Sequence, residues 1–250
     1  MGIKLIAFDL DGTLAPSKGP ISLEMSRALK DLLDYMPVCI ITGGSEKQIQ
    51  SQVISRLLPD TNLKNLQLMP TSGAIYLKYR FWTWRTVYSI ELKKQQARKI
   101  EDALKVAAEL LGYWPEQPYG KVIEDRGAQV TFSALGQKAP EYLKEAWDKD
   151  GSKKKLLRDV VSKLLPEFEV RSGGSTSIDV TRIGIDKGFA VRELMNRTFL
   201  KKEEILFVGD RFDVDGNDYP VIETGVEYQA VTGSKETLRL IRDLLKTLKV

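Results

Sequence analysis

Two aspartates near the start of the chain have the spacing that phosphoryl transfer requires. Asp9 and Asp11 follow an apolar run that ends at Phe8, and they lead into the turn formed by Gly12 and Thr13. Alternation along a strand would place both carboxylates on the same side. Beside a magnesium ion, one carboxylate can attack phosphorus while the other carries a proton. The alternative is a structural turn in which Asp11 makes a local hydrogen bond.

Three further segments carry groups that suit a phosphate or a metal ion, and they favour the catalytic interpretation. Two of them follow apolar runs typical of buried strands, and one precedes a helix-like stretch. A hydroxyl and backbone amides can bind phosphoryl oxygens, an ammonium can neutralise them, and a carboxylate can ligate a hard cation. The groups are Thr42, Gly43 and Gly44, then Lys187, and finally Asp210, Asn217 and Asp218.

The order of these motifs resembles that of the haloacid dehalogenase (HAD) superfamily of phosphoryl-transfer enzymes. The four motifs are D-x-D-G-T, T-G-G, a lone lysine and G-D…N-D, and they span residues 9–218. The resemblance implies that Asp9 is a nucleophile forming an aspartyl-phosphate, and that Asp11 protonates the leaving oxygen. It also implies that Thr42 and the amides of Gly43 and Gly44 bind phosphoryl oxygens. A plain tight turn before a helix is the alternative for those three residues.

The same resemblance assigns the charged groups around the phosphate. Lys187 would place its ammonium on the phosphoryl group and on Asp9. Magnesium would be held by Asp9, Asp210 and the backbone carbonyl of Asp11. Two neighbouring side chains of the last loop would orient Lys187 or a metal-bound water, namely Asn217 and Asp218.

Within the superfamily, the sequence is most similar to the eukaryotic-type phosphomannomutases and related sugar-phosphate phosphatases. Residues 172–180, followed by Gly-Ile-Asp-Lys at 184–187, resemble a segment of that family whose serine and aspartate contact the sugar. The matching residues here are Ser177 and Asp179. The family uses several arginines for the non-reacting phosphate, whereas this chain has Lys18, Arg126, Gln137 and Lys144 at those positions.

The residues at these arginine positions affect whether a mutase or a phosphatase is expected. A guanidinium binds phosphate in a bidentate manner and an ammonium does not, and Gln137 has no charge. A mutase must hold a distal phosphate while the substrate reorients, but a phosphatase only has to recognise its substrate. We therefore expect a phosphatase acting on a sugar phosphate or a similar small metabolite. A hexose phosphate mutase of the phosphomannomutase type is the alternative, and a non-catalytic sugar- or nucleotide-binding module is a third hypothesis.

The pattern of apolar runs predicts an α/β fold with a Rossmann-like parallel sheet. Near-continuous apolar runs at 3–8, 38–42, 66–70 and 205–208 indicate parallel strands buried on both faces. The pattern changes near residue 88, where a long amphipathic helix is followed by short strands, a surface loop at 148–153 and a second helix at 156–164. We expect a catalytic core from 1–87 and 187–250, interrupted by an α+β cap of type IIB at 88–186. The resemblance implies that this cap selects the substrate.

Composition excludes several classes of function. The chain of 250 residues has no histidine, so catalysis by a Ser-His pair and histidine-ligated metals are excluded, which favours magnesium on oxygen ligands. Cys39 is the only cysteine, so an intrachain disulfide is excluded. The net charge of +4 is spread over helix-like segments without a basic stripe, and we expect no nucleic-acid partner. No membrane span or signal pattern is evident, and we expect a cytoplasmic monomer or homodimer.

Overall fold

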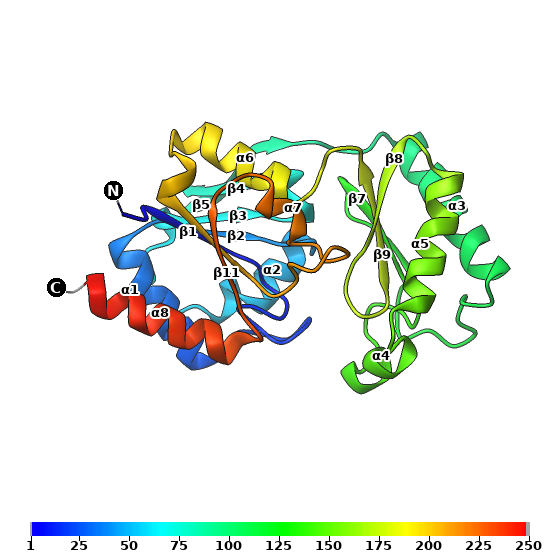
Figure 1. The fold of residues 1–250 in the computed structure, drawn as a ribbon, viewed down its shortest axis with the longest axis horizontal. Helices are drawn as coiled ribbons and strands as arrows, with labels where there is room; N and C mark the ends of the chain where they lie inside the picture. The colour runs from blue at the N-terminus through cyan, green and yellow to red at the C-terminus, as the bar shows by residue number, and fades with distance from the viewer. Residues whose placement is uncertain (1, 249–250) are drawn as a thin grey trace. The chain divides into compact units, whose positions relative to one another are not determined.

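A computed structural model describes residues 2–248 of the protein, which form two compact units (Figure 1). The first unit combines the residues up to Ser89 with those from Asp186 onward, and the second comprises Ile90–Ile185. The chain therefore leaves the first unit once and returns to it. None of the helices formed by residues 2–248 has the length and apolar character needed to cross a membrane.

The first unit contains a seven-stranded sheet in the order β11-β10-β1-β2-β3-β4-β5. The five strands from β11 to β3 are parallel, and β4 and β5 are antiparallel to their neighbours. The strands are β1 (Leu5–Phe8), β2 (Val38–Ile41), β3 (Leu66–Met69), β4 (Ile75–Arg80), β5 (Thr83–Ser89), β10 (Ile205–Gly209) and β11 (Glu227–Ala230).

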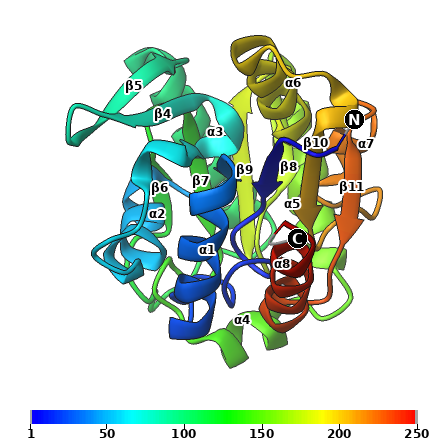
Figure 2. The same ribbon diagram turned by 90° about the vertical axis from the view of Figure 1, so that its left-hand side faces the viewer.

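Helices cover both faces of this sheet, as the view along it shows (Figure 2). Ile6 and Phe8 of β1 pack with one group of helices, and Leu5 and Ala7 pack with the other group. All four residues of β1 are apolar and buried, so both faces of the strand are covered by protein and neither is exposed to solvent. The first group is α1 (Leu23–Tyr35), α2 (Glu46–Gln52) and α8 (Ser234–Leu248), and the second is α6 (Lys187–Thr198) and α7 (Tyr219–Ile222).

The hairpin of β4 and β5 turns through only two residues, Phe81 and Trp82. Both have positive φ values, 50° and 63°, as the tight primed turns of hairpins require. Such turns usually contain asparagine or glycine, because a bulky side chain is strained in the left-handed region. Both aromatic side chains are exposed to solvent.

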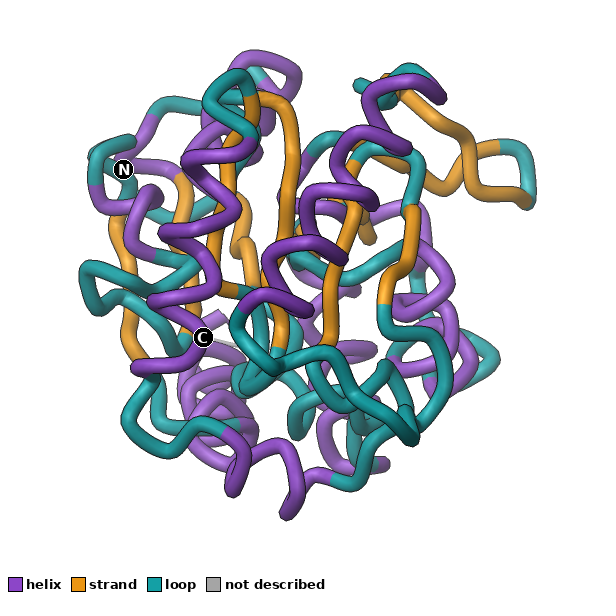
Figure 3. The backbone as a smooth tube through the Cα atoms, turned by 90° about the vertical axis from the view of Figure 1, so that its right-hand side faces the viewer, coloured by secondary structure: helices purple, strands orange, loops and turns teal. Residues whose placement is uncertain are grey.

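The second unit is an antiparallel sheet of four strands, in the order β6-β7-β9-β8, with helices against one face. Val130, Phe132, Ile178 and Val180 alternate onto the face that packs with α3 and α5. The helices and strands of both units can be followed in Figure 3. The elements of the second unit are α3 (Lys94–Leu110), β6 (Ile123–Asp125), β7 (Gln129–Ser133), α4 (Glu141–Trp147), α5 (Ser152–Leu164), β8 (Phe168–Ser172) and β9 (Ser177–Arg182).

The predicted α/β fold, with a mostly parallel sheet and an inserted α+β module, is confirmed. The α5 helix begins at Ser152, where the sequence favours a surface loop over 148–153 and a helix from Leu156. Its first turn is capped from a distance, because the Asp148 carboxylate accepts hydrogen bonds from the amides of Lys153 and Lys154, both at 3.0 Å.

Candidate active site

The candidate site of the first unit lies at the carboxyl ends of three adjacent strands. Asp9 follows β1, Thr42 follows β2, and Asp210 follows β10. Because β10, β1 and β2 are neighbours and parallel, these residues share one edge of the sheet. In open α/β sheets this edge is where ligands bind.

Helix α6 delivers a lysine to this edge. Asp186 caps the helix by accepting a hydrogen bond from the amide of Phe189 at 2.7 Å, which fixes Lys187 as the first helical residue. The Lys187 Nζ donates to Asp9 Oδ1 at 2.6 Å and to Asp218 Oδ1 at 2.5 Å. All three side chains are buried, so these ion pairs are shielded from water. The lysine therefore joins two carboxylates that lie far apart in sequence.

Asp218 is oriented by the loop that follows β10. Its Oδ2 accepts hydrogen bonds from the amides of Asp210, at 3.1 Å, and Arg211, at 3.0 Å. A side chain on Gly209 could not fit, because its Cβ would lie 2.5 Å from Asp218 Oδ2. The loop thus folds back on the strand end and presents one oxygen of Asp218 to Lys187.

Three carboxylates of this site are close enough to share a metal ion. Asp9, Asp210 and Asp218 each offer an oxygen, and the three atoms lie within 4.8 Å of one another. The Thr13 hydroxyl lies between two of them, 3.5 Å from Asp9 Oδ2 and 3.4 Å from Asp210 Oδ1. Lys187 is the ammonium bonded within this group, so three carboxyl groups share one positive charge. Oxygen ligands with an excess of negative charge fit a hard divalent cation such as Mg²⁺.

Burial governs the protonation of these groups. It raises the pKa of Asp9 well above the ordinary 3.8, because the attraction of Lys187 does not offset the loss of solvent and the nearby Asp218 and Asp210 add repulsion. The pKa of Asp210 is raised for the same leading reason. Burial alone would lower the pKa of Lys187, but Asp218 and Asp9 outweigh it and raise that pKa. The lysine is therefore cationic, and a further cation nearby would favour the ionised forms of Asp9 and Asp210.

The carboxylate of Asp11 is held apart from this group by helix α2. Asp11 Oδ2 accepts a hydrogen bond from Gln48 Nε2 at 2.8 Å, and Oδ1 accepts one from Gln52 Nε2 at 3.0 Å. The backbone amide of Lys18 also donates to Oδ1, at 2.6 Å. Asp11 is not one of the three carboxylates that could share a metal within residues 2–248. The expected contribution of Asp11 to the metal is its carbonyl, and that remains a prediction.

Thr42 lies in a tight turn before α2. Its hydroxyl oxygen accepts a hydrogen bond from the amide of Gly44 at 3.0 Å, and its carbonyl accepts from the amide of Ser72 at 2.8 Å. Ser45 then caps α2 by accepting from the amide of Gln48 at 3.3 Å. The Thr42 proton can still be donated to an oxygen, whereas the Gly44 amide is used within the turn.

The second unit brings the two expected sugar-contacting residues onto one face of its sheet. Ser177 and Asp179 of β9 lie opposite Ser133 and Thr131 of β7. The hydroxyls of Ser133 and Ser177 are 3.1 Å apart, and the Thr131 hydroxyl donates to Asp179 Oδ1 at 2.7 Å. This face is polar, opposite to the apolar face under α3 and α5.

The candidate phosphate-binding cations are distributed over both units. In the second unit, Arg126 Nε donates to Glu124 Oε2 at 2.8 Å, and the buried Lys144 lies 3.8 Å from a carboxylate oxygen of Glu141. Gln137 is half-buried in the same unit. Lys18 belongs to the first unit and has a left-handed backbone, with a φ of 55°. Arg126 and Lys144 thus each have a carboxylate nearby in their own unit.

Three residues that contact the site directly have no role assigned from the sequence. Thr13 touches two carboxylates, and Gln48 and Gln52 fix Asp11. Only the spacing of the two glutamines could have indicated that they act together, because residues four apart share a helix face. Nothing local in the sequence indicates that this face meets the turn after β1.

Comparison with a family-level sequence description matches residues 6–225 to the haloacid dehalogenase-like hydrolases. The matched range covers every strand-end residue described above. It also covers Lys187 and the loop to Asp218, and it spans both units of the structure.

Individual proteins give a similar result. A phosphomannomutase of Spinacia oleracea is 26% identical over 97% of this chain and 96% of its own length, and one of Saccharomyces cerevisiae is 23% identical over 96% and 93%. Among solved structures, the C-terminal domain of a C. albicans trehalose-6-phosphate phosphatase superposes with a TM-score of 0.66 at 17% identity, covering 98% of this chain and 92% of that one. A Plasmodium falciparum IMP-nucleotidase has a TM-score of 0.69 at 16% identity, covering 98% and 68%.

Proposed function

The chain belongs to the haloacid dehalogenase-like hydrolase family, and we propose that it is a magnesium-dependent phosphatase of a sugar phosphate or a similar small phosphorylated metabolite. The single observation that carries the proposal is the buried ion-pair network of Asp9, Lys187 and Asp218 beside Asp210. A carboxylate that only stabilised the fold would not need three charged neighbours at the ligand-binding edge of a sheet.

The residues present fit a magnesium ion. Asp9, Asp210 and Asp218 supply oxygen atoms within 4.8 Å of one another, and opposite ligands of magnesium lie about 4.2 Å apart at bond lengths of about 2.1 Å. The Asn217 side-chain oxygen is buried and has no hydrogen-bond partner within residues 2–248, which leaves it able to accept from a water. When bound, magnesium would offset the repulsion between the Asp9 carboxylate and a phosphate dianion.

We propose the following roles for the chain's own residues. An oxygen of Asp9 bonds to phosphorus while the bond from phosphorus to the sugar oxygen breaks, and Asp11 gives its proton to that oxygen. Water then attacks phosphorus, Asp11 takes a proton from this water, and the bond to Asp9 breaks to release phosphate. Throughout, Lys187 neutralises the phosphoryl oxygens.

Gln48 and Gln52 add a positioning role to this scheme. Both donate to the Asp11 carboxylate, so they hold one rotamer of a side chain that otherwise lies in a turn. We expect Asp11 to exchange one of these hydrogen bonds for the leaving oxygen when substrate binds. Thr42 would contribute its hydroxyl proton to a phosphoryl oxygen, because its oxygen already accepts from the Gly44 amide.

Two features support hydrolysis over isomerisation. Arg126 is paired with Glu124, and Lys144 lies near Glu141, so their charges are partly compensated. A mutase would need uncompensated cations to retain a distal phosphate while the sugar reorients. Gln137 adds no charge to this set.

A phosphomannomutase activity is the second candidate, and the full-length similarity to proteins of that name favours it. Under this reading the sugar hydroxyl, in place of water, takes the phosphoryl group from Asp9. The same residues would serve both reactions. The two reactions differ in how long the sugar stays bound.

One assay separates the candidates. The protein is given mannose-1-phosphate and magnesium, with and without a hexose bisphosphate, and free phosphate and mannose-6-phosphate are both measured. Release of phosphate supports the phosphatase, and bisphosphate-dependent mannose-6-phosphate supports the mutase. If neither product forms with a panel of sugar phosphates, the proposal of a sugar-phosphate enzyme is wrong.

A further inference from the structure

A cavity outside the candidate active site is lined by cations and lies on the β4–β5 hairpin and the end of α6. Its volume is about 470 Å³, which is within the range of small-molecule sites. It shares no lining residue with the candidate active site. The residues around it are Tyr76, Lys78, Arg80, Arg85, Thr86, Val87, Asn196, Arg197 and Phe199.

The register of the hairpin explains why the cations gather there. Tyr76, Lys78 and Arg80 alternate along one face of β4, and Arg85 of β5 lies directly opposite Lys78. Like charges opposite one another in a sheet destabilise it, so this pair costs the fold free energy. Tyr76 at the start of the row is buried in the core next to α6, whereas Lys78 is half-buried and Arg80 is exposed.

No carboxylate of residues 2–248 forms an ion pair with Lys78, Arg80 or Arg85. The fourth cation, Arg197, is paired with Glu193 at 2.8 Å and stacks on the ring of Tyr88. Burial, with repulsion from Arg80, lowers the pKa of Lys78, which is the response of a cation that lacks a counter-ion.

Apolar groups complete the cavity. Phe199 ends α6 in the left-handed region with a φ of 57°, and its side chain is 92% exposed. Glycine usually takes that position in a helix, so a bulky residue there is strained. Strained residues persist mostly at ligand clamps and switches. The exposed Val87, at the register shift of the hairpin, lies on the same cavity.

We propose that this cavity binds a nucleoside polyphosphate, with its phosphates on Lys78, Arg80 and Arg85 and its ring against Phe199 and Val87. Three cations that lack a carboxylate partner match the charge of a polyphosphate, and each can donate charge-assisted hydrogen bonds to its oxygens, although Lys78 also lies 5.2 Å from the ring centroid of Tyr76. The exposed aromatic ring provides a stacking surface for a base. The inference does not depend on which reaction the active site performs.

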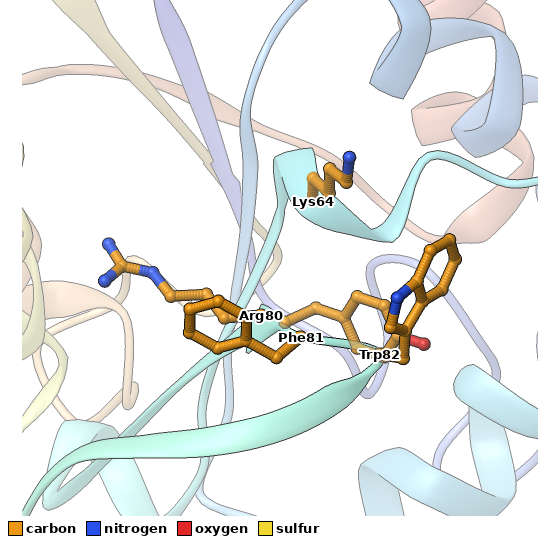
Figure 4. Close-up of a pocket in the computed structure, with 5 residues that line it drawn as sticks. Lys64, Arg80, Phe81 and Trp82 are labelled. Atoms are coloured by element: carbon orange, nitrogen blue, oxygen red, sulfur yellow. The ribbon is translucent and has the colours of Figure 1, made fainter.

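A neighbouring cavity offers a matched control. It has a volume of about 430 Å³ and is lined by Lys64, Tyr79, Arg80, Phe81 and Trp82. Figure 4 shows the Arg80 guanidinium pointing away from Lys64 and Trp82. Lys64→Ala therefore removes a nearby surface cation without changing the proposed phosphate contacts.

The test is calorimetric titration of the full chain with ATP, in EDTA and at low ionic strength so that the active site lacks metal. We expect Arg80→Ala/Arg85→Ala to weaken ATP binding by at least about tenfold, which corresponds to about 1.4 kcal/mol. Lys64→Ala should change it by less than about twofold, within the scatter of exposed charges. Inorganic triphosphate, which lacks the ring, should bind at least about tenfold more weakly than ATP.

Folding of the variants is checked by their melting temperature without ligand, which should not fall because like-charge repulsion is relieved. If the double variant unfolds, Arg85→Gln is used instead, and it should still weaken binding by several-fold, since one charge-assisted contact is lost. Equal ATP affinity of wild type and variant would overturn the site. Equal affinity for ATP and triphosphate would overturn the nucleoside part, and no binding to wild type would overturn the proposal as a whole.

Discussion

The two units each bury polar side chains, but they do so in opposite ways. In the first unit, the buried groups are ionisable, and Asp9, Lys187 and Asp218 hold one another across distant parts of the chain. In the second unit, the buried polar side chains of the sheet, such as Thr131, Ser133 and Ser177, are neutral, and the hydroxyls of Ser133 and Ser177 meet between directly opposed positions.

The two units differ in the partners that their buried polar groups still need. In the second unit, the hydroxyls of Ser133 and Ser177 satisfy one another, and the Asp179 carboxylate accepts a hydrogen bond from Thr131. The carboxylates of the first unit outnumber the one ammonium among them, so that cluster gains most from a bound cation. Substitutions in the first unit should therefore change catalysis and stability strongly, and those in the second should change substrate affinity mildly.

The largest effect is expected from Asp9→Asn. The amide cannot attack phosphorus, and activity should fall by at least about a thousandfold. Phosphate release is measured alongside labelling of the protein by phosphorylated substrate. Activity retained within about tenfold of the wild type would contradict the role of Asp9 as the nucleophile.

Lys187→Met tests the charge balance directly. Removal of the ammonium leaves buried carboxylates without their partner, and we expect a loss of about 3–5 kcal/mol in the free energy of unfolding of the metal-free protein. Denaturant titration measures the free energy of unfolding of the variant and of the wild type. The double variant Lys187→Met/Asp218→Asn should recover part of this loss. If the single variant is as stable as the wild type, the network does not contribute to stability as described.

Asp210→Ala should raise the magnesium concentration needed for half-maximal activity by at least about tenfold, because one oxygen ligand is lost. The matched control is Asp213→Ala, since Asp213 pairs with Arg211 at the surface. An unchanged magnesium dependence in Asp210→Ala would mean that the metal is held elsewhere.

A smaller effect is expected in the second unit. Asp179 is expected to accept a hydrogen bond from the sugar, so Asp179→Asn should lower kcat/KM by about fivefold, mostly through KM, in line with about 1 kcal/mol for one hydrogen bond. Thr181→Ser, on the same strand, serves as the control. A fall in kcat without a change in KM would argue against a substrate-binding role.

The last prediction concerns pH. Burial raises the pKa of Asp9 above 3.8, so the folded state favours the neutral carboxyl. Its contribution to stability is fully present below pH 3.8 and is lost as the pH rises through the folded value. In EDTA, the melting temperature of the wild type should therefore fall relative to that of Asp9→Asn as the pH rises from 3.8. Parallel melting curves at all pH values would contradict the direction of that shift.

The sequence predicts the core of the first unit well, because buried parallel strands are short apolar runs and their ends carry the motif residues. Asp9, Thr42 and Asp210 could be placed at one sheet edge on this basis alone. The contacts of Gln48 and Gln52 with Asp11 could not, since they depend on how α2 packs against a turn. The start of α5 was missed because Asp148, outside the helix, provides the cap.

The order of the strands has a consequence for synthesis of the chain on the ribosome. Strand β1 lies between β2 and β10, and all of the second unit is translated before β10 emerges. The edge of β1 that pairs with β10 therefore stays unpaired until β10 has been made, and unpaired strand edges promote aggregation. The second unit is contiguous and can fold during that interval. We therefore expect newly made chains truncated before Ile205 to bind chaperones through the unfinished sheet, while their second unit is already resistant to protease.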